Sequence, residues 1–415
     1  MEGQATAARC RHCDTELSDV VADLGTHPLC ESFLTAEQLH RMEPHYPLIV
    51  FVCRSCWLVQ LEQFVAPGDI FSEYAYFSSY ATTWVEHARR YVEMIAQRLC
   101  LGPRSRVVEV ASNDGYLLQH FLPLGIPVLG IEPAANVARV AIEKGVPTRV
   151  EFFGEDYAGR LVEEGLRADL IAGNNVLAQV PDLNDFVRGL KRLLAPGGTI
   201  TLEFPHLEKL FAENQFDTIY HEHFSYFSTL AVSNIFRAQG LELYDVEEIP
   251  THGGSLRVYF KHAGSETPPT SESVARLIER EVRAGFLDVA TYLAFNERVK
   301  ETKRALLEFL IRLKRAGKRI AGYGAPGKGN TLLNYCGVGR DFLDFTVDRN
   351  PYKHGRFLPG THVPIFEPAR IEHEKPDYVL ILPWNFKDEI KAQLRSIRAW
   401  GGQFIVPIPV AHVEE

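Results

Sequence analysis

Apolar residues in the middle of the chain follow two alternating patterns, short β-branched runs and longer segments of helical period. Over residues 84–99 they recur at helical spacing, which predicts a helix. Residues 106–111 have the composition of a short buried strand, and a tight loop and the helical residues 116–121 follow it. Further strand-like runs cover 128–131 and begin again at Ala168. Strands that alternate with helices predict an α/β fold around a parallel sheet.

The second half of the chain adds an antiparallel pair and then repeats the alternation. Residues 241–246 and 256–260 are strand-like, and we expect them to be antiparallel neighbours in the first sheet. Helical spacing predicts a long charged helical stretch over 271–316. A second strand, loop and helix begin at Lys318, and another strand is expected over 342–347. The sequence therefore predicts a C-terminal Rossmann-like α/β domain.

Length and composition place these patterns in a modular protein. A chain of 415 residues exceeds one ordinary core, and the changes of pattern predict domains at 1–70, 71–265 and 266–415. A hydrophobic content of 46% and a charged content of 23% are those of a soluble globular protein, and no apolar run is long enough to span a membrane. A net charge of −9 disfavours a nucleic-acid partner. The first residues lack a secretory signal, so we expect a cytoplasmic protein, with a monomer as the default.

Four of the seven cysteines form two CxxC pairs in the first sixty residues. Two such turns offer four thiolates, which close a tetrahedron around a structural zinc ion. A pair of redox or incidental dithiols is the alternative. The predicted ligands are Cys10, Cys13, Cys53 and Cys56. We expect the other three, Cys30, Cys100 and Cys336, to be small buried apolar residues.

The loop after the first strand has the chemistry of a nucleoside site. The sequence Glu109-Val-Ala-Ser-Asn-Asp-Gly115 ends in a single glycine, whereas a dinucleotide's pyrophosphate requires GxGxxG. Glu132 ends the second strand, where an acidic residue accepts hydrogen bonds from ribose hydroxyls. The sequence resembles the first motif of class I methyltransferases, with Ala111 and Asn113 where glycines are commoner. This likeness implies a cofactor, S-adenosylmethionine, bound by Tyr76, Ala111, Asn113, Gly115, Glu132 and Asn174.

The segment Tyr220-His-Glu-His-Phe-Ser-Tyr226 holds the strongest candidates for acid–base chemistry. A neutral imidazole takes a proton from carbon next to a ketone, a phenol such as Tyr220 donates to the resulting oxyanion, and Glu222 orients an imidazole or a sugar hydroxyl. A metal site is an alternative, but His221 and His223 have no third ligand at a convincing spacing. Packed or surface histidines are the structural alternative.

Gly322-Tyr-Gly-Ala-Pro-Gly-Lys328 is a second glycine-rich loop after a strand. It satisfies GxGxxG, with Asp348 in place for a ribose, but as a P-loop it lacks the Ser or Thr that follows the lysine. Such a loop offers backbone N–H groups and Lys328 to a diphosphate, and Asn330, His354 and Arg356 are candidates for further contacts. Thr251-His-Gly-Gly-Ser-Leu-Arg257 is either a hairpin connection or backbone that approaches a ligand.

Taken in order, these motifs resemble the nucleotide-sugar C-methyltransferases over nearly the whole chain. The resemblance implies a zinc-binding domain, a central domain for S-adenosylmethionine, and a C-terminal domain that holds the nucleotide of a dTDP-linked 4-keto deoxysugar, methylated at C-3. It implies His223 as the base, with Tyr220 and Glu222 beside it. Gln179 stands where relatives often carry a histidine, and an amide does not titrate. The implied substrate contacts are His252, Tyr323, Lys328, Asn330, Asp348 and Arg356. An O- or N-methyltransferase and an inactive zinc-containing binding protein remain alternatives.

Overall fold

The central part of the chain folds around a seven-stranded sheet in the computed structural model, which describes residues 8–71 and 77–414. The strand order is β10-β11-β8-β7-β4-β5-β6. The five strands from β8 to β6 are parallel, and β11 pairs antiparallel with both β8 and β10. The strands are β4 (Val107–Val110), β5 (Val128–Ile131), β6 (Thr148–Arg149), β7 (Ala168–Asn174), β8 (Leu194–Pro205), β10 (Leu241–Ile249) and β11 (Ser255–His262). The expected antiparallel pair at 241–246 and 256–260 is confirmed.

The segments between these strands form helices that pack on the sheet, because apolar residues recur on one face of each helix. The helix expected over 84–99 is α2 (Thr82–Arg98), which buries Trp84, Tyr91 and Ile95. Residues 116–121 are not an α-helix but the first of two short 3-10 turns, and Pro123 lies in the second. The remaining helices are α3 (Ala135–Glu143), α4 (Glu155–Glu163), α5 (Leu183–Leu193), α6 (Leu207–Ala212) and α7 (Thr229–Ala238).

The N-terminal segment forms a small antiparallel sheet that takes one strand from the central part of the chain. Its order is β1-β2-β3-β9, from Asp19–His27, Tyr46–Val52, Val59–Leu61 and Ser225–Tyr226. Val59 pairs with Tyr226 and Gln60 with Ser225. The short helix α1 (Pro67–Phe71) follows. The segment that carries the acid–base motif is therefore tied to the cysteine-rich sheet.

A six-stranded sheet forms the C-terminal part, in the order β14-β13-β12-β15-β16-β17. All its strands are parallel except β17. They are β12 (Ile320–Tyr323), β13 (Thr346–Val347), β14 (Ile365–Phe366), β15 (Tyr378–Ile381), β16 (Gln403–Val406) and β17 (His412–Glu414). The strand expected over 342–347 is shorter, because only its last two residues pair with β12. Its helices are α10 (Gly327–Cys336), α11 (Arg370–Glu374) and α12 (Lys387–Gln393).

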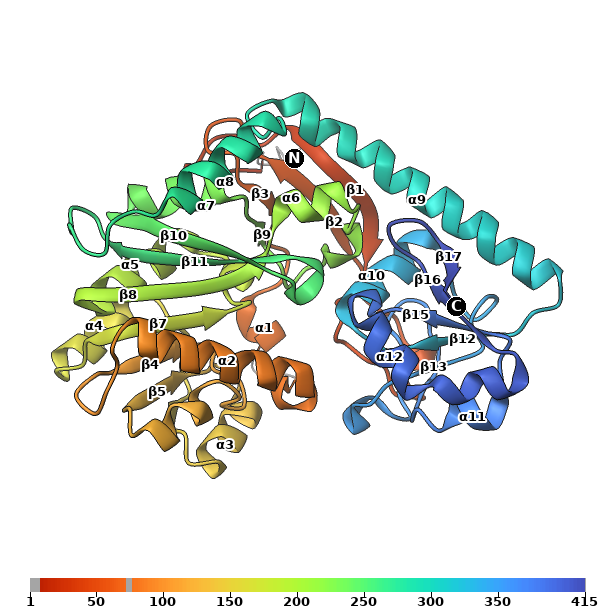
Figure 1. Ribbon diagram of the computed structural model, residues 1–415. Helices are drawn as coiled ribbons and strands as arrows, with labels where there is room; N and C mark the ends of the chain where they lie inside the picture. The colour runs from red at the N-terminus through yellow and green to blue at the C-terminus, as the bar shows by residue number, and fades with distance from the viewer. Residues whose placement is uncertain (1–7, 72–76, 415) are drawn as a thin grey trace.

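Two helices connect the sheets. The helical stretch 271–316 is divided into α8 (Glu272–Arg283) and α9 (Val289–Arg315), separated by a turn in which Gly285 has φ +88°. Helix α8 packs on α7 and β10, and α9 packs on β1 and α10. Figure 1 shows the seven-stranded and six-stranded sheets side by side, with β1 and β2 between them at the top and α9 along the outside. No helix among the described residues has the length and apolarity needed to cross a membrane.

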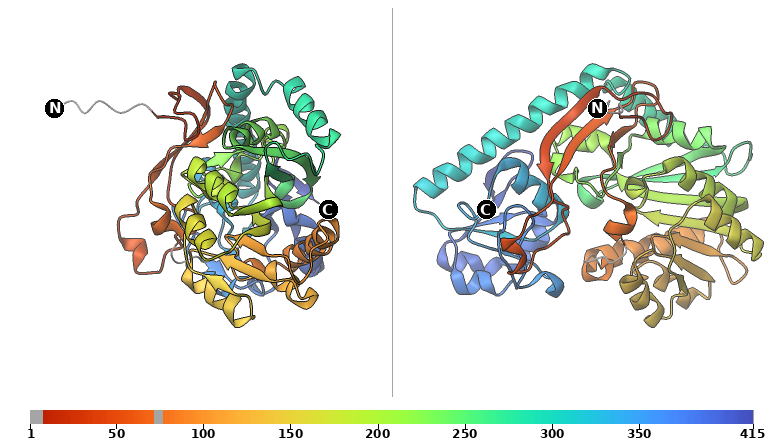
Figure 2. Two further views of the ribbon diagram at one scale, coloured as in Figure 1. Left: turned by 90° about the vertical axis from the view of Figure 1, so that its left-hand side faces the viewer. Right: turned by 180° about the vertical axis from the view of Figure 1, so that it is seen from behind.

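Buried apolar side chains of the N-terminal segment belong to two cores, one shared with the central sheet and one shared with the C-terminal part. Leu17 and Leu58 of the N-terminal segment share a core with the central sheet. Val50 of β2 shares another with Phe295 of α9 and Leu332 of α10. The view from behind in Figure 2 shows the N-terminal segment running down beside the C-terminal part, where Leu34 forms a backbone bridge with Phe357. The N-terminal segment therefore fixes the other two parts relative to each other.

Candidate functional site

The four CxxC cysteines meet in one cluster, with all four Sγ atoms within 4.8 Å of one another. The closest pairs are Cys10 with Cys56 at 3.5 Å and Cys13 with Cys53 at 3.4 Å. Four thiolates around zinc lie about 3.8 Å apart when each Zn–S bond is about 2.3 Å. Each CxxC turn ends in a residue with positive φ, Asp14 or Trp57, whose N–H donates to the carbonyl of the turn's first cysteine. The donor set fits a structural zinc ion.

The remaining cysteines do not contribute to this cluster. Cys30 and Cys336 are buried, as expected. The expectation for Cys100 is wrong, because it is exposed. It follows the end of α2 with φ +51°, in a turn that leaves the apolar face of the helix.

The loop after β4 has the backbone conformation that glycine-rich loops adopt. Ala111, Asn113 and Gly115 all have positive φ, at +58°, +48° and +75°. A Cβ on Gly115 would lie 3.1 Å from both Ala141 Cβ and a methyl group of Val146, so this position also needs the missing side chain. The loop therefore follows the expected path although two of its glycines are replaced.

Glu132 lies beside this loop, at the end of β5. Its carboxylate accepts hydrogen bonds from the N–H groups of Asn113 and Ala134, both at 2.8 Å. Burial raises the pKa of Glu132 to about 7, and the nearby Asp114 adds to this effect against the two N–H groups. Further hydrogen-bond donors, such as ribose hydroxyls, would stabilise the charged form of this carboxyl group.

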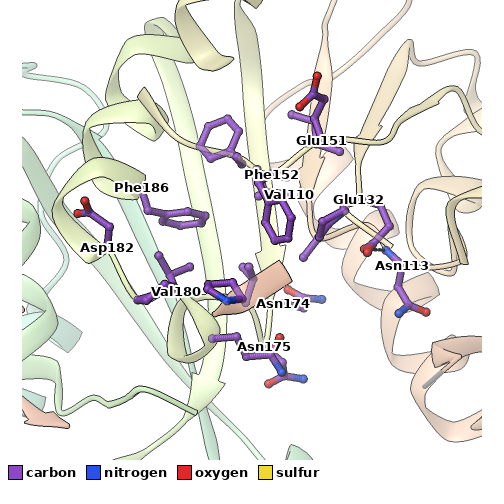
Figure 3. Close-up of a pocket in the computed structure, with 18 of the residues that line it drawn as sticks. Val110, Asn113, Glu132, Glu151, Phe152, Asn174, Asn175, Val180, Asp182 and Phe186 are labelled. Atoms are coloured by element: carbon purple, nitrogen blue, oxygen red, sulfur yellow. Dashed lines mark hydrogen bonds between the residues drawn. The ribbon is translucent and has the colours of Figure 1, made fainter. Parts of the chain in front are cut away.

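A cavity of about 450 Å³ opens where β4, β5 and β7 end. Figure 3 shows Asn113 and Glu132 on one side of it, Phe186 on the other, and Asn174 and Asn175 at one end. Asn174 Nδ2 is buried and has no hydrogen-bond partner, a donor that suits a polar end of S-adenosylmethionine. Ala111 also lines the cavity, whereas Gly115 shapes the loop without lining it. Tyr76 lies outside the described residues.

A second cavity of about 330 Å³ lies between the central and C-terminal parts. Asn175 and Gln179 line both cavities, so the two share a wall. The second brings together eight site residues expected from the sequence: Gln179, Tyr220, Glu222, His223, His252, Tyr323, Lys328 and Asp348.

His223 is held as a neutral imidazole with one nitrogen available to the second cavity. Its Nδ1 lies 3.1 Å from the carbonyl oxygen of Thr218, which requires that Nδ1 carry the proton. Burial lowers the pKa of His223 to about 4, and the Lys328 cation acts in the same direction. Nε2 is then an unprotonated base. The ring of Tyr220 lies 4.1 Å from the His223 ring, and burial holds the pKa of this phenol well above its usual value, so it remains a donor.

The two histidines of the motif face different surroundings. His221 contacts the carbonyl of Pro47 at 3.1 Å and packs edge-on against Tyr46, both in the N-terminal sheet. Among the described residues, neither histidine belongs to a group that could hold a metal ion. Glu222 remains in the second cavity, where its carboxylate accepts a hydrogen bond from the Cys30 thiol at 3.4 Å. The arrangement favours acid–base chemistry over metal binding.

The first part of the glycine-rich loop after β12 uses its backbone donors within the protein. The N–H of Gly324 donates to Val347, that of Ala325 donates to the Asp348 carboxylate at 2.7 Å, and Pro326 has none. The Asp348 carboxylate therefore stabilises the conformation of the loop. Three successive positions, 324–326, thus offer no free N–H to a diphosphate, and the remaining donors are the first N–H groups of α10, which begins at Gly327.

The Thr251–Arg257 segment is both a connection between strands and a contact with the C-terminal part. His252 has φ +55°, and its Nε2 accepts a hydrogen bond from Asn175 Nδ2 at 2.9 Å. Burial lowers the pKa of His252 to about 3. A Cβ on Gly253 would lie 2.7 Å from the ring of Trp384, so this glycine allows the two parts to approach.

Two of the expected substrate contacts do not line the cavity. Asn330 is buried and accepts from the Asn334 amide, and Arg356 points toward the carbonyl of Phe33. His354, the other candidate near that loop, contacts the carbonyl of Asp348 at 2.7 Å. These residues support the loops around the cavity.

Sequence reasoning missed several residues that line the second cavity. Asn175 was within reach, because it follows Asn174 in the same motif. Glu31 and Lys353 carried no local signal, and they meet only because the N-terminal segment crosses to the C-terminal part. Lys353 Nζ lies 3.4 Å from Glu31 and donates to the carbonyl of Ala325.

Comparisons with known proteins match successive parts of the chain. Residues 10–71 match the family described as "Putative zinc binding domain", residues 84–246 "Methyltransferase domain", and residues 250–409 "C-methyltransferase C-terminal domain". The chain is 36% identical to C-methyltransferase NovU of Streptomyces niveus over 404 residues, 97% of this chain and 96% of that protein. Among solved structures it is similar to the CcbJ methyltransferase of Streptomyces caelestis, at 14% identity and a TM-score of 0.34, covering 43% of this chain and 90% of that one.

The sheet order, the loop after β4 and the acid after β5 define a class I methyltransferase that uses S-adenosylmethionine, here with a zinc-binding domain. Its cofactors are S-adenosylmethionine and a structural zinc ion. The chain belongs to the C-methyltransferase family that includes NovU.

Proposed function

We propose that this C-methyltransferase acts on a dTDP-linked 4-keto deoxysugar and methylates the ring carbon beside the ketone, C-3. The observation that carries the proposal is the position of His223. Its unprotonated Nε2 belongs to a cavity that shares Asn175 and Gln179 with the cofactor cavity. A base so placed removes a proton from a carbon atom that is within reach of the methyl donor. Methyl transfer to oxygen or nitrogen does not require the removal of a carbon-bound proton.

Each residue of the motif has a distinct task in this proposal. His223 Nε2 takes the proton from C-3, the C–H electrons form a C=C bond, and the ketone oxygen becomes an enolate. Tyr220 donates a hydrogen bond to that oxygen, and Glu222 accepts one from a sugar hydroxyl. Bound S-adenosylmethionine supplies the electrophilic methyl group on its sulfonium sulfur. Gln179, at the shared wall, orients the substrate without exchanging protons with it.

The nucleotide is proposed to extend toward the C-terminal part. Tyr323 and Asp348 line that end of the cavity, and His252 lines the end near the cofactor domain. Asn330 and Arg356 act on binding only through the loops they support. The family resemblance of the motifs, rather than any single contact, favours dTDP as the nucleotide.

Deuterium exchange without a methyl donor tests the base directly. The protein is incubated with a dTDP-4-keto deoxysugar in D₂O, and label at C-3 is followed by NMR. We expect exchange with the natural protein and a loss of about 100-fold or more in His223→Ala, the lower range for a general base. His221→Ala is the matched control, because His221 contacts Pro47 and not the cavity. Equal exchange in His223→Ala and the natural protein would refute the assignment of the base.

The rival functions give different results in the same experiment. An O- or N-methyltransferase gives a methylated hydroxyl or amine without enzyme-dependent exchange. An inactive binding protein binds S-adenosylhomocysteine but gives neither exchange nor product across a panel of 4-keto sugars. The position of a new methyl group, read by NMR of the product, decides between C-3 and another ring carbon.

A further inference from the structure

Lys328 occupies a place that its sequence motif does not predict. The glycine-rich loop resembles a phosphate-binding loop, in which the lysine contacts phosphate oxygens. In the structure Lys328 Nζ donates to Asn385 Oδ1 at 2.9 Å and lies 4.6 Å from the centre of the Trp384 ring. The side chain lines the same cavity as Tyr220, His223 and His252.

The first part of the loop, residues 324–326, offers no N–H group to a diphosphate. The N–H groups of Gly324 and Ala325 are already bonded within the protein, and Pro326 has none. A second cation that lines the cavity, Arg349, lies on a more exposed part of the wall, where it pairs with Glu389 at 3.0 Å. A charged diphosphate that stays partly in water fits Arg349 better than Lys328.

We propose that Lys328 is a catalytic residue that stabilises the enolate oxygen formed when His223 deprotonates the sugar. This inference rests on the proposed function. The C–H electron pair becomes the C=C bond, the carbonyl π pair moves to oxygen, His223 holds the proton, and the ammonium of Lys328 faces the new negative charge. A cation held in place by the protein stabilises such a charge more strongly than a cation in solution, because it does not have to reorient when the charge develops.

A buried acid from the central part maintains the charge on Lys328. Asp217 is fully buried, and its carboxylate accepts a hydrogen bond from Trp384 Nε1 at 2.7 Å. Its other oxygen, Oδ1, has no hydrogen-bond partner. Burial lowers the pKa of Lys328, and the Asp217 charge opposes that effect. The cation and its counter-charge come from the two parts of the chain that form the cavity, so the arrangement exists only when those parts are together.

The positive charge also acts on the histidines of the cavity. Lys328 opposes protonation of both His223 and His252, in each case together with burial. The same residue that stabilises the enolate therefore favours the base in the unprotonated form that can accept the proton.

The test compares Lys328→Met, Lys328→Arg and Arg349→Met in two assays. The first is the deuterium exchange at saturating keto sugar, without methyl donor. The second is the affinity for dTDP alone, measured by calorimetry. We expect Lys328→Met to lower the exchange rate by about 100-fold, the usual loss when one oxyanion-stabilising group is removed. Its dTDP affinity should stay unchanged, and Lys328→Arg should recover part of the exchange. Arg349→Met should weaken dTDP binding more than Lys328→Met does.

The opposite pattern would overturn the proposal. If Lys328→Met loses dTDP affinity but keeps its saturated exchange rate, the lysine binds the diphosphate. Unaltered binding of S-adenosylhomocysteine shows that the variant is folded. If the natural protein itself gives no exchange with any 4-keto sugar, the proposed function fails and the role of Lys328 fails with it. Normal exchange in both proteins refutes only the role of Lys328.

Discussion

The raised pKa of Glu132 leads us to expect that cofactor affinity depends on pH near neutrality. Its pKa is about 7 in the ligand-free protein because the carboxyl group is buried, whereas its ordinary value is 4.5. A pKa raised on folding stabilises the ligand-free protein at low pH, and this contribution is lost as pH rises from 4.5 through 7. A pKa shift of this size changes the free energy of unfolding by about 3 kcal/mol between the two ends of that pH range.

Binding has the opposite dependence on pH. Ribose hydroxyls that donate to the Glu132 carboxylate stabilise its charged form, so the bound complex has a lower pKa and binding releases a proton. If the bound pKa falls below 5, the affinity at pH 5.5 is about 20-fold weaker than at pH 7.5, or slightly more. The ligand for this measurement is S-adenosylhomocysteine, titrated by calorimetry at several pH values and in buffers of different ionisation enthalpy.

Glu132→Gln is the control for this prediction. The amide keeps nearly the same shape, does not titrate, and should give an affinity that is flat over the same range. Two other acids lie close, Asp114 on the loop and Glu109 on β4. If Glu132→Gln keeps the full pH dependence, one of these acids is responsible and the reasoning about Glu132 is refuted.

Three further predictions concern the base, the zinc ion and the contact between domains. Because the pKa of His223 is about 4, α-proton exchange should keep its rate from pH 8 down to about pH 5; a loss centred near pH 6.5 would contradict this. Removal of zinc by a chelator, or Cys13→Ser, should lower exchange as well as zinc content measured by atomic absorption, since β3 pairs with β9 beside the base; full exchange without metal would refute that link. Gly253→Ala should lower the rate of exchange more than Gly254→Ala, because only the first Cβ meets Trp384, whereas the second meets the flexible side chain of a lysine; equal effects would leave backbone strain as the cause.

Local sequence was sufficient for the features that depend on neighbouring residues. The CxxC spacing identified the four cysteines that cluster, and the β-branched runs identified most strands of the central sheet. The strand before Asn113 and the strand before Glu132 are adjacent and parallel, so their carboxyl ends meet at one edge of the sheet. That rule was enough to expect the cofactor residues around one cavity, and the structure places Asn113, Glu132 and Asn174 there.

Other features required the complete fold. Tyr76 lies outside the described residues, and the site roles of His223, Tyr220 and Glu222 remain predictions. At the expected phosphate loop, the motif indicates free backbone N–H groups, but residues elsewhere in the fold already bond two of them. The pattern of glycines and Lys328 is local, but the use of the N–H groups by Val347 and Asp348 depends on residues more than twenty positions away.

The sequence alone was enough to identify the cofactor and the metal, since the motifs that indicate each of them are short and local, at turns and at strand ends. The tertiary structure decided which groups face the substrate. Glu31, His223 and Lys353 come from segments far apart in the chain, and they line one cavity because the N-terminal sheet joins the other two parts. The pKa values of His223 and Glu132 likewise depend on burial by distant segments. Residue type and spacing contain no measure of that burial, which is the physical reason why the chemistry of this site could be read only from the folded chain.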